Sequence, residues 1–246
     1  MILNDFALLL SDTARSKAYL QAMIQEDKKP AICIVYSDDI AKMKRDSEEY
    51  KDKGRAVNYF DIDEPILYSL HESDIDYILL KDKNINSPQM EDILREVKQK
   101  YIIYSGYGGY ILKPHLFRLD KKFIHVHAGI LPQYRGSTTI YYSFLQERIL
   151  GATAIFLNEG IDEGKIITQE TFAIPGEPID IDYIYEPFMR SRVLMKVINQ
   201  YLLYGYLTAY PQDKKEEETY FIIHPVLKHL AMLEIDNIQE LKRGKE

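Results

Sequence analysis

The sequence predicts an α/β fold in which a mostly parallel sheet carries helices on both faces, with a small appendage at the C-terminus. Two observations predict it. Short apolar, β-forming runs alternate with helix-forming segments along most of the chain, which is the pattern of strand–helix–strand units. Glycine-rich or polar turns also follow two strand-like runs directly, at 105–109 and 127–136. Because ligands bind at the carboxyl ends of strands in open α/β sheets, these turns are the expected binding edge.

Composition limits the function classes. The chain has 246 residues, of which 46% are hydrophobic and 28% charged, which is an ordinary globular mixture. Its net charge of −7 and the lack of a long basic stripe argue against nucleic-acid binding, since phosphate contacts need clustered Lys and Arg. The N-terminus lacks the layout of a signal peptide, and no apolar run approaches the ~20 residues that span a bilayer. The single cysteine, Cys33, suits a cytoplasmic protein without disulfides.

The first half of the chain reads as alternating strands and helices. A strand at 6–10 leads into an N-cap candidate at 11–13 and a helix, and a second strand follows at 31–36. No Gly-x-Gly-x-x-Gly motif follows the first strand, so a dinucleotide site of the usual kind is disfavoured. We further expect a charged, solvated helix at 39–53, strands at 57–60, 75–80 and 101–104, and a helix at 89–99.

The second half contains a helix at 138–148 and two apolar runs, 152–157 and 165–172, which we expect to pair as a hairpin. A long helix follows Tyr185-Glu-Pro187 and continues to about residue 204, because Pro is well placed in a first turn. Beyond it we expect a solvated linker at 211–219, a strand-like run at 220–223, a helix at 225–235 and a loose tail at 241–246. The predicted domains are therefore 1–205 and a small extension, 206–246.

Three side chains from two distant segments are the strongest candidates for chemistry. His125 and His127 lie in the strand-like run that starts at Phe123, and a period of two places both rings on one face. Asp162 lies in a short acidic loop between the two runs of the predicted hairpin. A carboxylate beside a histidine orients the ring and favours its charged form, which tunes proton transfer near neutral pH. A metal site with these three residues as ligands, supplemented by His115 or His224, is the rival interpretation.

The motifs around these residues resemble the folate-dependent formyltransferase family. They read His-Val-His-Ala-Gly-Ile-Leu-Pro-Gln-Tyr-Arg-Gly at 125–136 and Gly-Ile-Asp-Glu-Gly-Lys-Ile-Ile-Thr-Gln-Glu at 160–170. The family hallmark is Asn-x-His, then Ser-Leu-Leu-Pro-x-Tyr-x-Gly, then a loop ending in Asp-x-Gly. The resemblance is firm over 101–170 and extends through 1–205. It implies a Rossmann-like formyltransferase fold and 10-formyltetrahydrofolate as formyl donor.

By position, the resemblance assigns catalytic roles to His127 and Asp162, with His125 at the site of the family's asparagine. The acceptor is expected to be the amino group of a small molecule, because the acidic chain and its short C-terminal extension are unlike a tRNA-binding enzyme. Sugar-nucleotide N-formyltransferases are the most similar branch. Tyrosines 141, 142 and 220 could stack a nucleotide base, with a purely structural role as the alternative for each. The resemblance implies folate-binding residues at Gly106, Tyr107, Gly108, Gly109, Ile111, Gly160 and Ile161, and substrate-binding residues at Tyr134, Arg135 and Gly136. The Arg135 side chain could contact a phosphate or a carboxylate, or it could brace its own loop.

The histidine at 125 departs from the family pattern and leaves three alternatives open. An asparagine donates an N–H at any pH, whereas donation by a histidine depends on its tautomer or charge. His125 could replace the asparagine as an oxyanion donor, the protein could catalyse related one-carbon chemistry, or it could be a degenerate, formyltransferase-like binding protein. A metal-dependent hydrolase that uses His125, His127 and Asp162 as ligands is the alternative outside the family. The sequence leaves the oligomeric state open, and a homodimer is one of the states that it allows.

Overall fold

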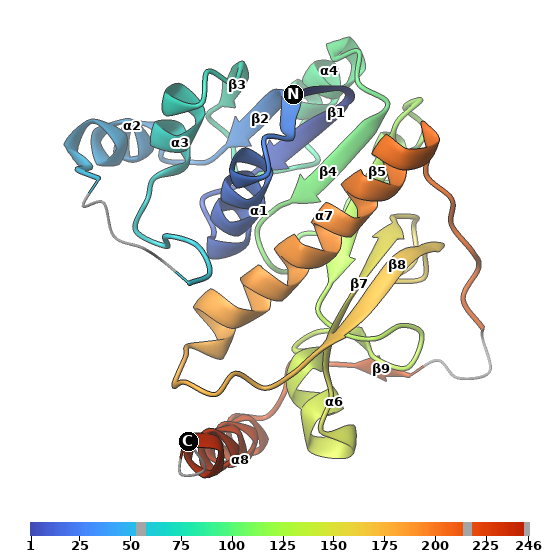
Figure 1. The fold of residues 1–246 in the computed structure, drawn as a ribbon. Helices are drawn as coiled ribbons and strands as arrows, with labels where there is room; N and C mark the ends of the chain where they lie inside the picture. The colour runs from blue at the N-terminus through green and yellow to red at the C-terminus, as the bar shows by residue number, and fades with distance from the viewer. Residues whose placement is uncertain (53–57, 214–217, 244–246) are drawn as a thin grey trace. The chain divides into compact units, whose positions relative to one another are not determined.

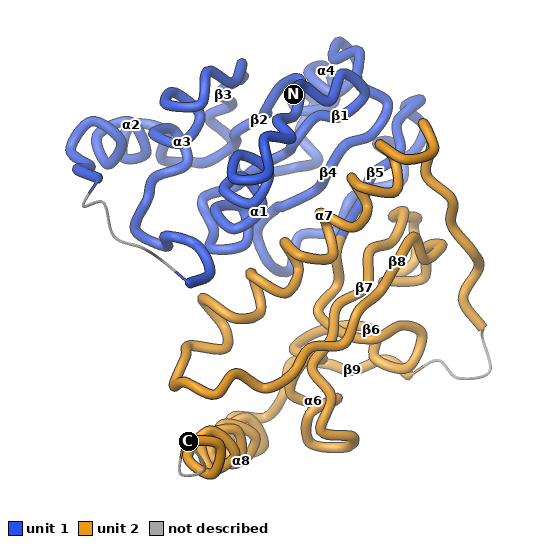
Figure 2. Tube along the Cα trace, viewed as in Figure 1, with its two compact units in different colours: residues 1–125 blue, residues 126–246 orange. Residues whose placement is uncertain are grey.

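The computed structural model describes residues 1–52, 58–213 and 218–243 (Figure 1). The chain divides into two compact units, unit 1 with residues 1–125 and unit 2 with residues 126–246 (Figure 2). This boundary differs from the predicted one at 205/206, and the described part of 206–246 belongs to unit 2. Whether residues 1–205 form a catalytic domain of their own stays a prediction.

Unit 1 is built around a parallel sheet whose strands pair in the order β3-β2-β1-β4-β5. β5 crosses the boundary and ends in unit 2. The elements of this part are β1 (Ile2–Leu10), α1 (Ala14–Gln25), β2 (Lys29–Tyr36), α2 (Ile40–Glu49), α3 (Ile66–Glu72), β3 (Tyr77–Leu80), α4 (Pro88–Glu96), β4 (Tyr101–Ser105), α5 (Pro114–Phe117) and β5 (Lys122–His127).

The centre of unit 1 is β1, which has a parallel neighbour on each side. The five side chains from Phe6 to Leu10 are all 0% exposed, as expected for a strand covered on both faces. Each fully buried leucine of this kind stabilises the fold by roughly 2 kcal/mol. The predicted cap of the first helix is confirmed, because Thr13 accepts a hydrogen bond from the Ser16 backbone at 3.2 Å.

Unit 2 holds the remaining elements, including a short π-helical turn, η1. Its long helix α7 packs on β7, β8 and η1. The apolar periodicity of this helix predicts a buried face, which is confirmed at Met189, Val193, Leu194, Val197 and Ile198, whereas Tyr201 of the same predicted face is half-buried. These elements are β6 (Arg135–Gly136), α6 (Thr139–Glu147), β7 (Leu150–Phe156), β8 (Ile166–Phe172), η1 (Ile181–Tyr185), α7 (Glu186–Tyr204), β9 (Thr219–Tyr220) and α8 (Pro225–Arg243).

The predicted fold class is confirmed. β7 and β8 pair antiparallel, as the predicted hairpin requires, and they extend the sheet to the order β3-β2-β1-β4-β5-β7-β8. Seven strands, mostly parallel and accompanied by helices, form this sheet. In the described residues no helix is both long enough and apolar enough to cross a membrane.

A second, two-stranded sheet joins the C-terminal extension to the turn after β5. Thr219 and Tyr220 of β9 pair in parallel with Arg135 and Gly136 of β6. Gly136 has a φ of +98°, and a Cβ atom there would lie 2.1 Å from the Tyr220 carbonyl oxygen. Only glycine tolerates both the backbone conformation and this close approach. The extension therefore reaches the segment that the motif analysis selected.

Some local predictions were wrong. Residues 58–60 form a bend and not a strand, and position 57 of that predicted strand lies outside the described residues. The helix α3 was missed, since Ile66, Leu67 and Leu70 form only two turns of apolar periodicity. Residues 241–243 belong to α8 and not to a loose tail, because Ala231, Ile235 and Gln239 continue one buried stripe along that helix; 244–246 lie outside the described residues.

The region before α3 gives a stability prediction that depends on pH. Partial burial raises the pKa of the Glu64 carboxyl above its ordinary value of 4.5, although the Ser69 hydroxyl donates a hydrogen bond to it. The folded state therefore holds this proton more tightly than the unfolded chain, and stability falls as pH rises through the raised pKa. We expect Glu64→Gln to increase the free energy of unfolding at neutral pH and to have little effect below pH 4.5.

Urea denaturation of both proteins at the two pH values measures this difference. Glu72→Gln is the matched control, because Glu72 is the last residue of α3 and its side chain is 56% exposed. The control should change the unfolding free energy little at either pH. An equal effect of Glu64→Gln at both pH values would contradict the role given to burial.

Candidate active site

His127 is the last residue of β5, and its ring is almost fully buried at 4% exposure. Its Nε2 atom lies 2.6 Å from the carbonyl oxygen of Tyr134 and 3.1 Å from Oγ1 of Thr139. Thr139 in turn donates its hydroxyl proton to the Ala128 carbonyl oxygen at 2.6 Å. The turn after β5 and the start of α6 thus hold the ring from two sides.

These contacts fix the protonation of Nε2. A carbonyl oxygen can only accept, so Nε2 must carry a hydrogen and donate it to Tyr134. The Thr139 hydroxyl has already given its one proton to Ala128, so it too acts as an acceptor toward Nε2. The other ring nitrogen, Nδ1, is therefore the atom that is available for proton exchange.

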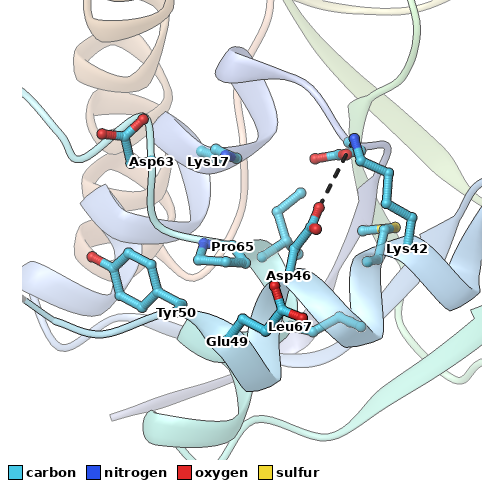
Figure 3. A pocket seen from close by; sticks show the side chains of 11 residues that line it. Lys17, Lys42, Asp46, Glu49, Tyr50, Asp63, Pro65 and Leu67 are labelled. Atoms are coloured by element: carbon cyan, nitrogen blue, oxygen red, sulfur yellow. Dashed lines mark ion pairs between the residues drawn. The ribbon is translucent and has the colours of Figure 1, made fainter.

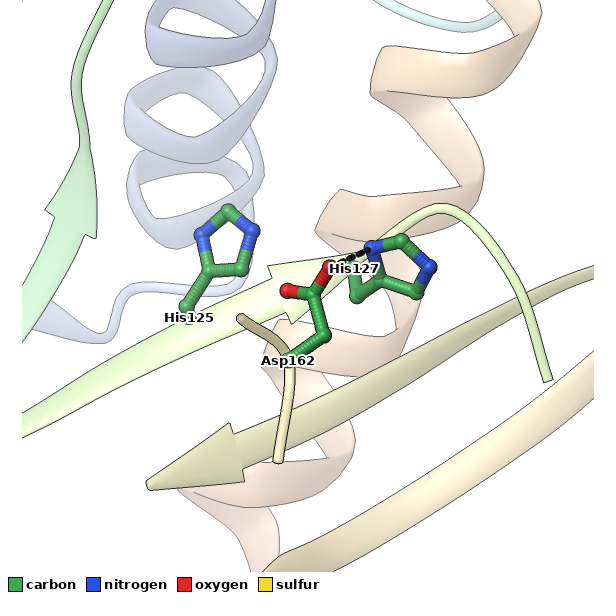
Figure 4. A group of neighbouring side chains, drawn as sticks. All are labelled: His125, His127 and Asp162. Carbon is green, nitrogen blue, oxygen red and sulfur yellow. Dashed lines mark ion pairs between the residues drawn. The ribbon is translucent and has the colours of Figure 1, made fainter. Parts of the chain in front are cut away.

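Asp162 faces that nitrogen. Its Oδ2 atom lies 3.3 Å from Nδ1 of His127, and the dashed line in Figure 4 marks this pair. The same oxygen accepts a hydrogen bond from the Gly136 backbone N–H at 3.0 Å. Because two lone pairs would repel at this distance, the contact is attractive when one proton lies between the ring and the carboxylate. The predicted convergence of residues 127 and 162 is confirmed.

The backbone of Asp162 also has an uncommon conformation. Its φ is +54°, in the left-handed region that few non-glycine residues adopt. Two residues later, Gly164 passes so close to the Phe156 carbonyl oxygen that a Cβ atom would lie 1.6 Å from it. Aspartate and glycine are the residue types that tolerate such a tight loop. The loop thereby directs the carboxylate toward β5.

Two residues of the predicted substrate loop, on either side of Arg135, bind the two catalytic candidates. The Tyr134 carbonyl accepts from His127, and the Gly136 N–H donates to Asp162. Between them, the Arg135 side chain is buried at 4% exposure and donates two hydrogen bonds to Oε1 of Gln212, at 3.1 and 2.8 Å. In this structure the three residues hold the site together. The substrate-binding role that the resemblance implies for them stays a prediction.

We expected several tyrosines to stack a nucleotide base. In the structure they contact other tyrosine rings or the carboxylates of acidic residues. Tyr220 lies against Tyr134 and Tyr142, with ring centroids 5.6 and 4.5 Å apart. Tyr141 donates its hydroxyl proton to Asp182 at 2.6 Å, and burial together with that carboxylate raises the pKa of Tyr141. Burial and the Glu147 carboxylate likewise raise the pKa of Tyr134. These hydroxyls are therefore hydrogen-bond donors at neutral pH.

His125 lies on β5 two residues before His127, and its ring is half-buried (Figure 4). Its ring centroid is 6.1 Å from that of Tyr104 on β4. Among the metal-site candidates in the described residues are His125, His127 and Asp162. A metal on His127 would have to use Nδ1, because Nε2 is a donor to Tyr134. The metal interpretation stays a prediction.

The predicted folate-binding residues come from both units. In unit 1, Gly109 has a φ of +80°, Ile111 is exposed, and the Gly106 carbonyl accepts a hydrogen bond from Arg15. Tyr107 packs edge-on against Tyr36, with ring centroids 5.7 Å apart. Gly108 has open space around its Cα, and in unit 2 Gly160 and the exposed Ile161 lie in the loop that carries Asp162. Their folate-binding role stays a prediction.

Each unit contains a cavity among its described residues. One in unit 2 has a volume of about 210 Å³ and is lined by His127, Gly136, Thr139 and Tyr141, with the charged residues Asp182, Glu186 and Arg190. Within it, Arg190 forms an ion pair with Glu186. The other cavity, in unit 1, has about 370 Å³ and is lined by mixed charges, among them Lys17, Lys42, Asp46, Glu49 and Asp63 (Figure 3). Only the first cavity borders a catalytic candidate.

Sequence reasoning missed two residues of this site, Thr139 and Gln212. Thr139 follows the motif at the start of a helix, where a threonine is unremarkable in sequence. Gln212 lies in the predicted solvated linker, and no local pattern sets it apart from other polar residues there. Both are found only through their three-dimensional contacts with His127, Arg135 and the Asp162 loop.

Comparison with known proteins places the site in context. The formyl transferase family model matches residues 5–180. Methionyl-tRNA formyltransferase of Finegoldia magna is 29% identical over 157 residues, which are 63% of this chain and 49% of that protein. The chain thus spans about half the length of this relative.

Two solved structures have a similar fold. An N-formyltransferase from Helicobacter canadensis, in complex with folinic acid and dTDP-3-aminofucose, superposes with a TM-score of 0.55 at 19% identity and covers 90% of this chain and 71% of that one. A sugar N-formyltransferase from a Shewanella species has a TM-score of 0.57 at 16% identity, over 94% and 87% of the two chains.

The geometry at Gly136 predicts the effect of a single methyl group. We expect Gly136→Ala to lower the free energy of unfolding by about 1–3 kcal/mol, because alanine is strained at this φ and would press on the Tyr220 carbonyl. Urea denaturation measures it. Gly176→Ala is the control, since nothing lies within 4 Å of the added atom there. Equal losses in the two variants would contradict the close approach of β6 and β9.

Proposed function

Because the chain belongs to the formyl transferase family, we propose that it transfers a formyl group from 10-formyltetrahydrofolate to the amino group of a small molecule. The observation that carries the proposal is the pair of buried His127 and half-buried Asp162, with 3.3 Å between Nδ1 and Oδ2. Transfer of an acyl group to an amine requires removal of a proton from the attacking nitrogen. A carboxylate whose orientation is fixed by a histidine and a backbone N–H is suited to that task.

The reaction has two bond changes. The amine nitrogen attacks the formyl carbon and forms a tetrahedral oxyanion, and the bond from that carbon to N10 of the folate then breaks. The amine loses one proton and N10 gains one, so no oxidant or further reactant is needed. Donors that already point at the oxyanion can lower the barrier by about 3–4 kcal/mol.

The contacts of Asp162 support different roles for its two carboxylate oxygens. Oδ2 is held by the Gly136 N–H and faces His127. In the part of the chain that the structure describes, no hydrogen bond or ion pair engages Oδ1. We assign Oδ1 as the atom that accepts the amine proton, directly or through a water molecule. His127 keeps the carboxylate in position and can share the Nδ1 proton as charge develops.

His125 is proposed as the oxyanion donor, in place of the family's asparagine. A histidine donates from whichever ring nitrogen carries a hydrogen, so activity should depend on its tautomer or charge. The folate is proposed to contact the glycine-rich turn 106–109 with Ile111, and also Gly160 and Ile161. These assignments rest on the resemblance of the motifs.

A nucleotide-linked amino sugar is the acceptor that we propose. Two similar folds belong to proteins described as sugar N-formyltransferases or as bound to dTDP-3-aminofucose, and the net charge of −7 is unfavourable for tRNA. The relatives named as methionyl-tRNA formyltransferases are the reason to test that acceptor too. The cavity beside His127, with about 210 Å³, is below the roughly 300 Å³ of a drug-sized ligand site, so it suits only the end of the substrate that bears the amine. A cytoplasmic location is part of the proposal.

An acceptor panel tests the function. Purified protein is incubated with 10-formyltetrahydrofolate and, separately, with a dTDP-linked amino sugar, glycinamide ribonucleotide and methionyl-tRNA, and products are identified by mass spectrometry. We expect formylation of the sugar amine. Release of formate without an acceptor would indicate hydrolysis, and no folate binding in calorimetry would contradict the proposal. Stoichiometric zinc or iron in the same sample would favour the metal-dependent hydrolase.

Removing the charge of Asp162 tests the proposed base. Asp162→Asn keeps the size of the side chain and an acceptor for Gly136, but it cannot take up a proton at neutral pH. We expect the turnover rate to fall by about a hundredfold or more. Glu163→Gln, an exposed acid in the same loop, serves as the control and should retain activity. Wild-type turnover in the Asn variant would exclude Asp162 as the base.

Restoring the family residue at position 125 separates the remaining alternatives. If His125 is the oxyanion donor, His125→Asn should remain active and should lose the part of the pH–rate profile that depends on the imidazole. Activity that appears only in the Asn variant would mark the natural protein as a degenerate member. Loss of activity with folate binding intact would indicate chemistry that requires the histidine.

A further inference from the structure

The side chain of Gln212 connects two loops of the candidate site. Its Oε1 atom accepts both hydrogen bonds from Arg135, at 3.1 and 2.8 Å. Its Nε2 atom donates to the backbone carbonyls of Asp162 and Gly164, at 2.7 Å each. One glutamine therefore links the loop that binds His127 to the loop that carries Asp162.

The chemistry of the four partners permits only one orientation of this amide. A guanidinium can only donate and a carbonyl oxygen can only accept, so the oxygen of Gln212 must face Arg135 and its nitrogen must face the Asp162 loop. Both lone pairs and both N–H groups of the amide are thereby used. No smaller or singly polar side chain could make all four contacts.

The chain path explains why a residue so far from the motifs is present here. Tyr210 pairs with Ile166 through two backbone hydrogen bonds of 2.9 Å, in an isolated antiparallel bridge. This bridge lays the segment after α7 against the first residue of β8, next to the Asp162 loop. Gln212 follows two residues later, and β9 then pairs with Arg135 and Gly136.

We infer that Gln212 is a positioning residue for the His127–Asp162 pair, an inference that rests on the proposed function. Asp162 has a φ of +54°, in a region that few non-glycine residues adopt, and hydrogen bonds from outside its loop help to keep the carboxylate aimed at Nδ1. Gln212 donates one hydrogen bond to the carbonyl oxygen of Asp162 and one to the carbonyl oxygen of Gly164. It also ties that loop to Arg135, whose two neighbours bind His127 and Asp162. Gln212 lies outside residues 5–180, which the family model covers.

Three substitutions distinguish positioning from a general effect on folding. Gln212→Met preserves the length of the side chain but removes all four hydrogen bonds. Gln212→Glu keeps the acceptor for Arg135 and places a second oxygen against the two carbonyls. Gln200→Met is the matched control, because Gln200 is a half-buried glutamine of unit 2 that accepts a hydrogen bond from the Thr208 backbone.

If Gln212 positions the pair, kcat should fall about tenfold or more in Gln212→Met, while the KM for the folate stays nearly unchanged. Gln212→Glu should lose as much or more, because it repels the Asp162 loop although its contact with Arg135 is strengthened. The Gln200→Met control should match the wild type in both constants. If Gln212→Glu keeps wild-type kcat, the link to the Asp162 loop has no catalytic role and the inference is wrong.

A second readout does not require turnover. The ring ¹⁵N chemical shifts of His127, assigned with the help of His127→Gln, report the Nε2 hydrogen and the environment of Nδ1 at a fixed pH. We expect the Nδ1 signal to change in both Gln212 variants and to stay constant in Gln200→Met. Failure of the proposed function would be seen as absence of formyl transfer by the wild type, whereas unchanged His127 shifts in both Gln212 variants would overturn the positioning role.

Discussion

The site depends on one short piece of backbone, residues 134–136. Its first carbonyl fixes the hydrogen on Nε2 of His127, and its last N–H holds Oδ2 of Asp162. The ring nitrogen that remains, Nδ1, then meets the carboxylate that has been turned toward it. Because backbone groups cannot rotate away as side chains can, the geometry of the pair is set before any ligand arrives. Such preorganisation is what makes an acid–base pair efficient.

The rest of unit 2 keeps that backbone in place. β9 pairs with residues 135 and 136, so this strand of the C-terminal extension supports the site. The hairpin of β7 and β8 presents the Asp162 loop, and Leu131, Ile155 and Ile166 form a small apolar core beneath it. Thr153 adds a hydrogen bond to the Gly129 carbonyl at 2.7 Å, which ties the hairpin to the turn after β5.

Periodicity and turn chemistry predicted much of this arrangement. Alternating apolar runs identified most strands, and the motifs at 125–136 and 160–170 identified the histidines and the loop with Asp162. Those signals are local, so they are visible in sequence. The roles of Thr139 and Gln212 were not predictable, because each depends on contacts across 12 or more positions of the chain, from His127 to Thr139 and from Arg135 to Gln212.

The tyrosines show what composition leaves undecided. Their number is compatible both with a stacking platform for a base and with ordinary half-buried structure, and in the structure Tyr220 packs against Tyr134 and Tyr142. Base stacking by these rings stays a prediction. Composition alone cannot tell an aromatic cluster that stabilises a turn from one that binds a ligand. Nor could it show that the side chain of Arg135, in a motif position open to substrate contact, would be 4% exposed and bonded to Gln212.

The most direct test of the account is a crystal structure of the protein with a nonreactive analogue of 10-formyltetrahydrofolate. We expect the formyl carbon to lie beside the His127–Asp162 pair, with Oδ2 still bound to the Gly136 N–H and Oδ1 open to the acceptor amine. An analogue bound away from this pair, or a histidine and aspartate too far apart to share a proton, would contradict it.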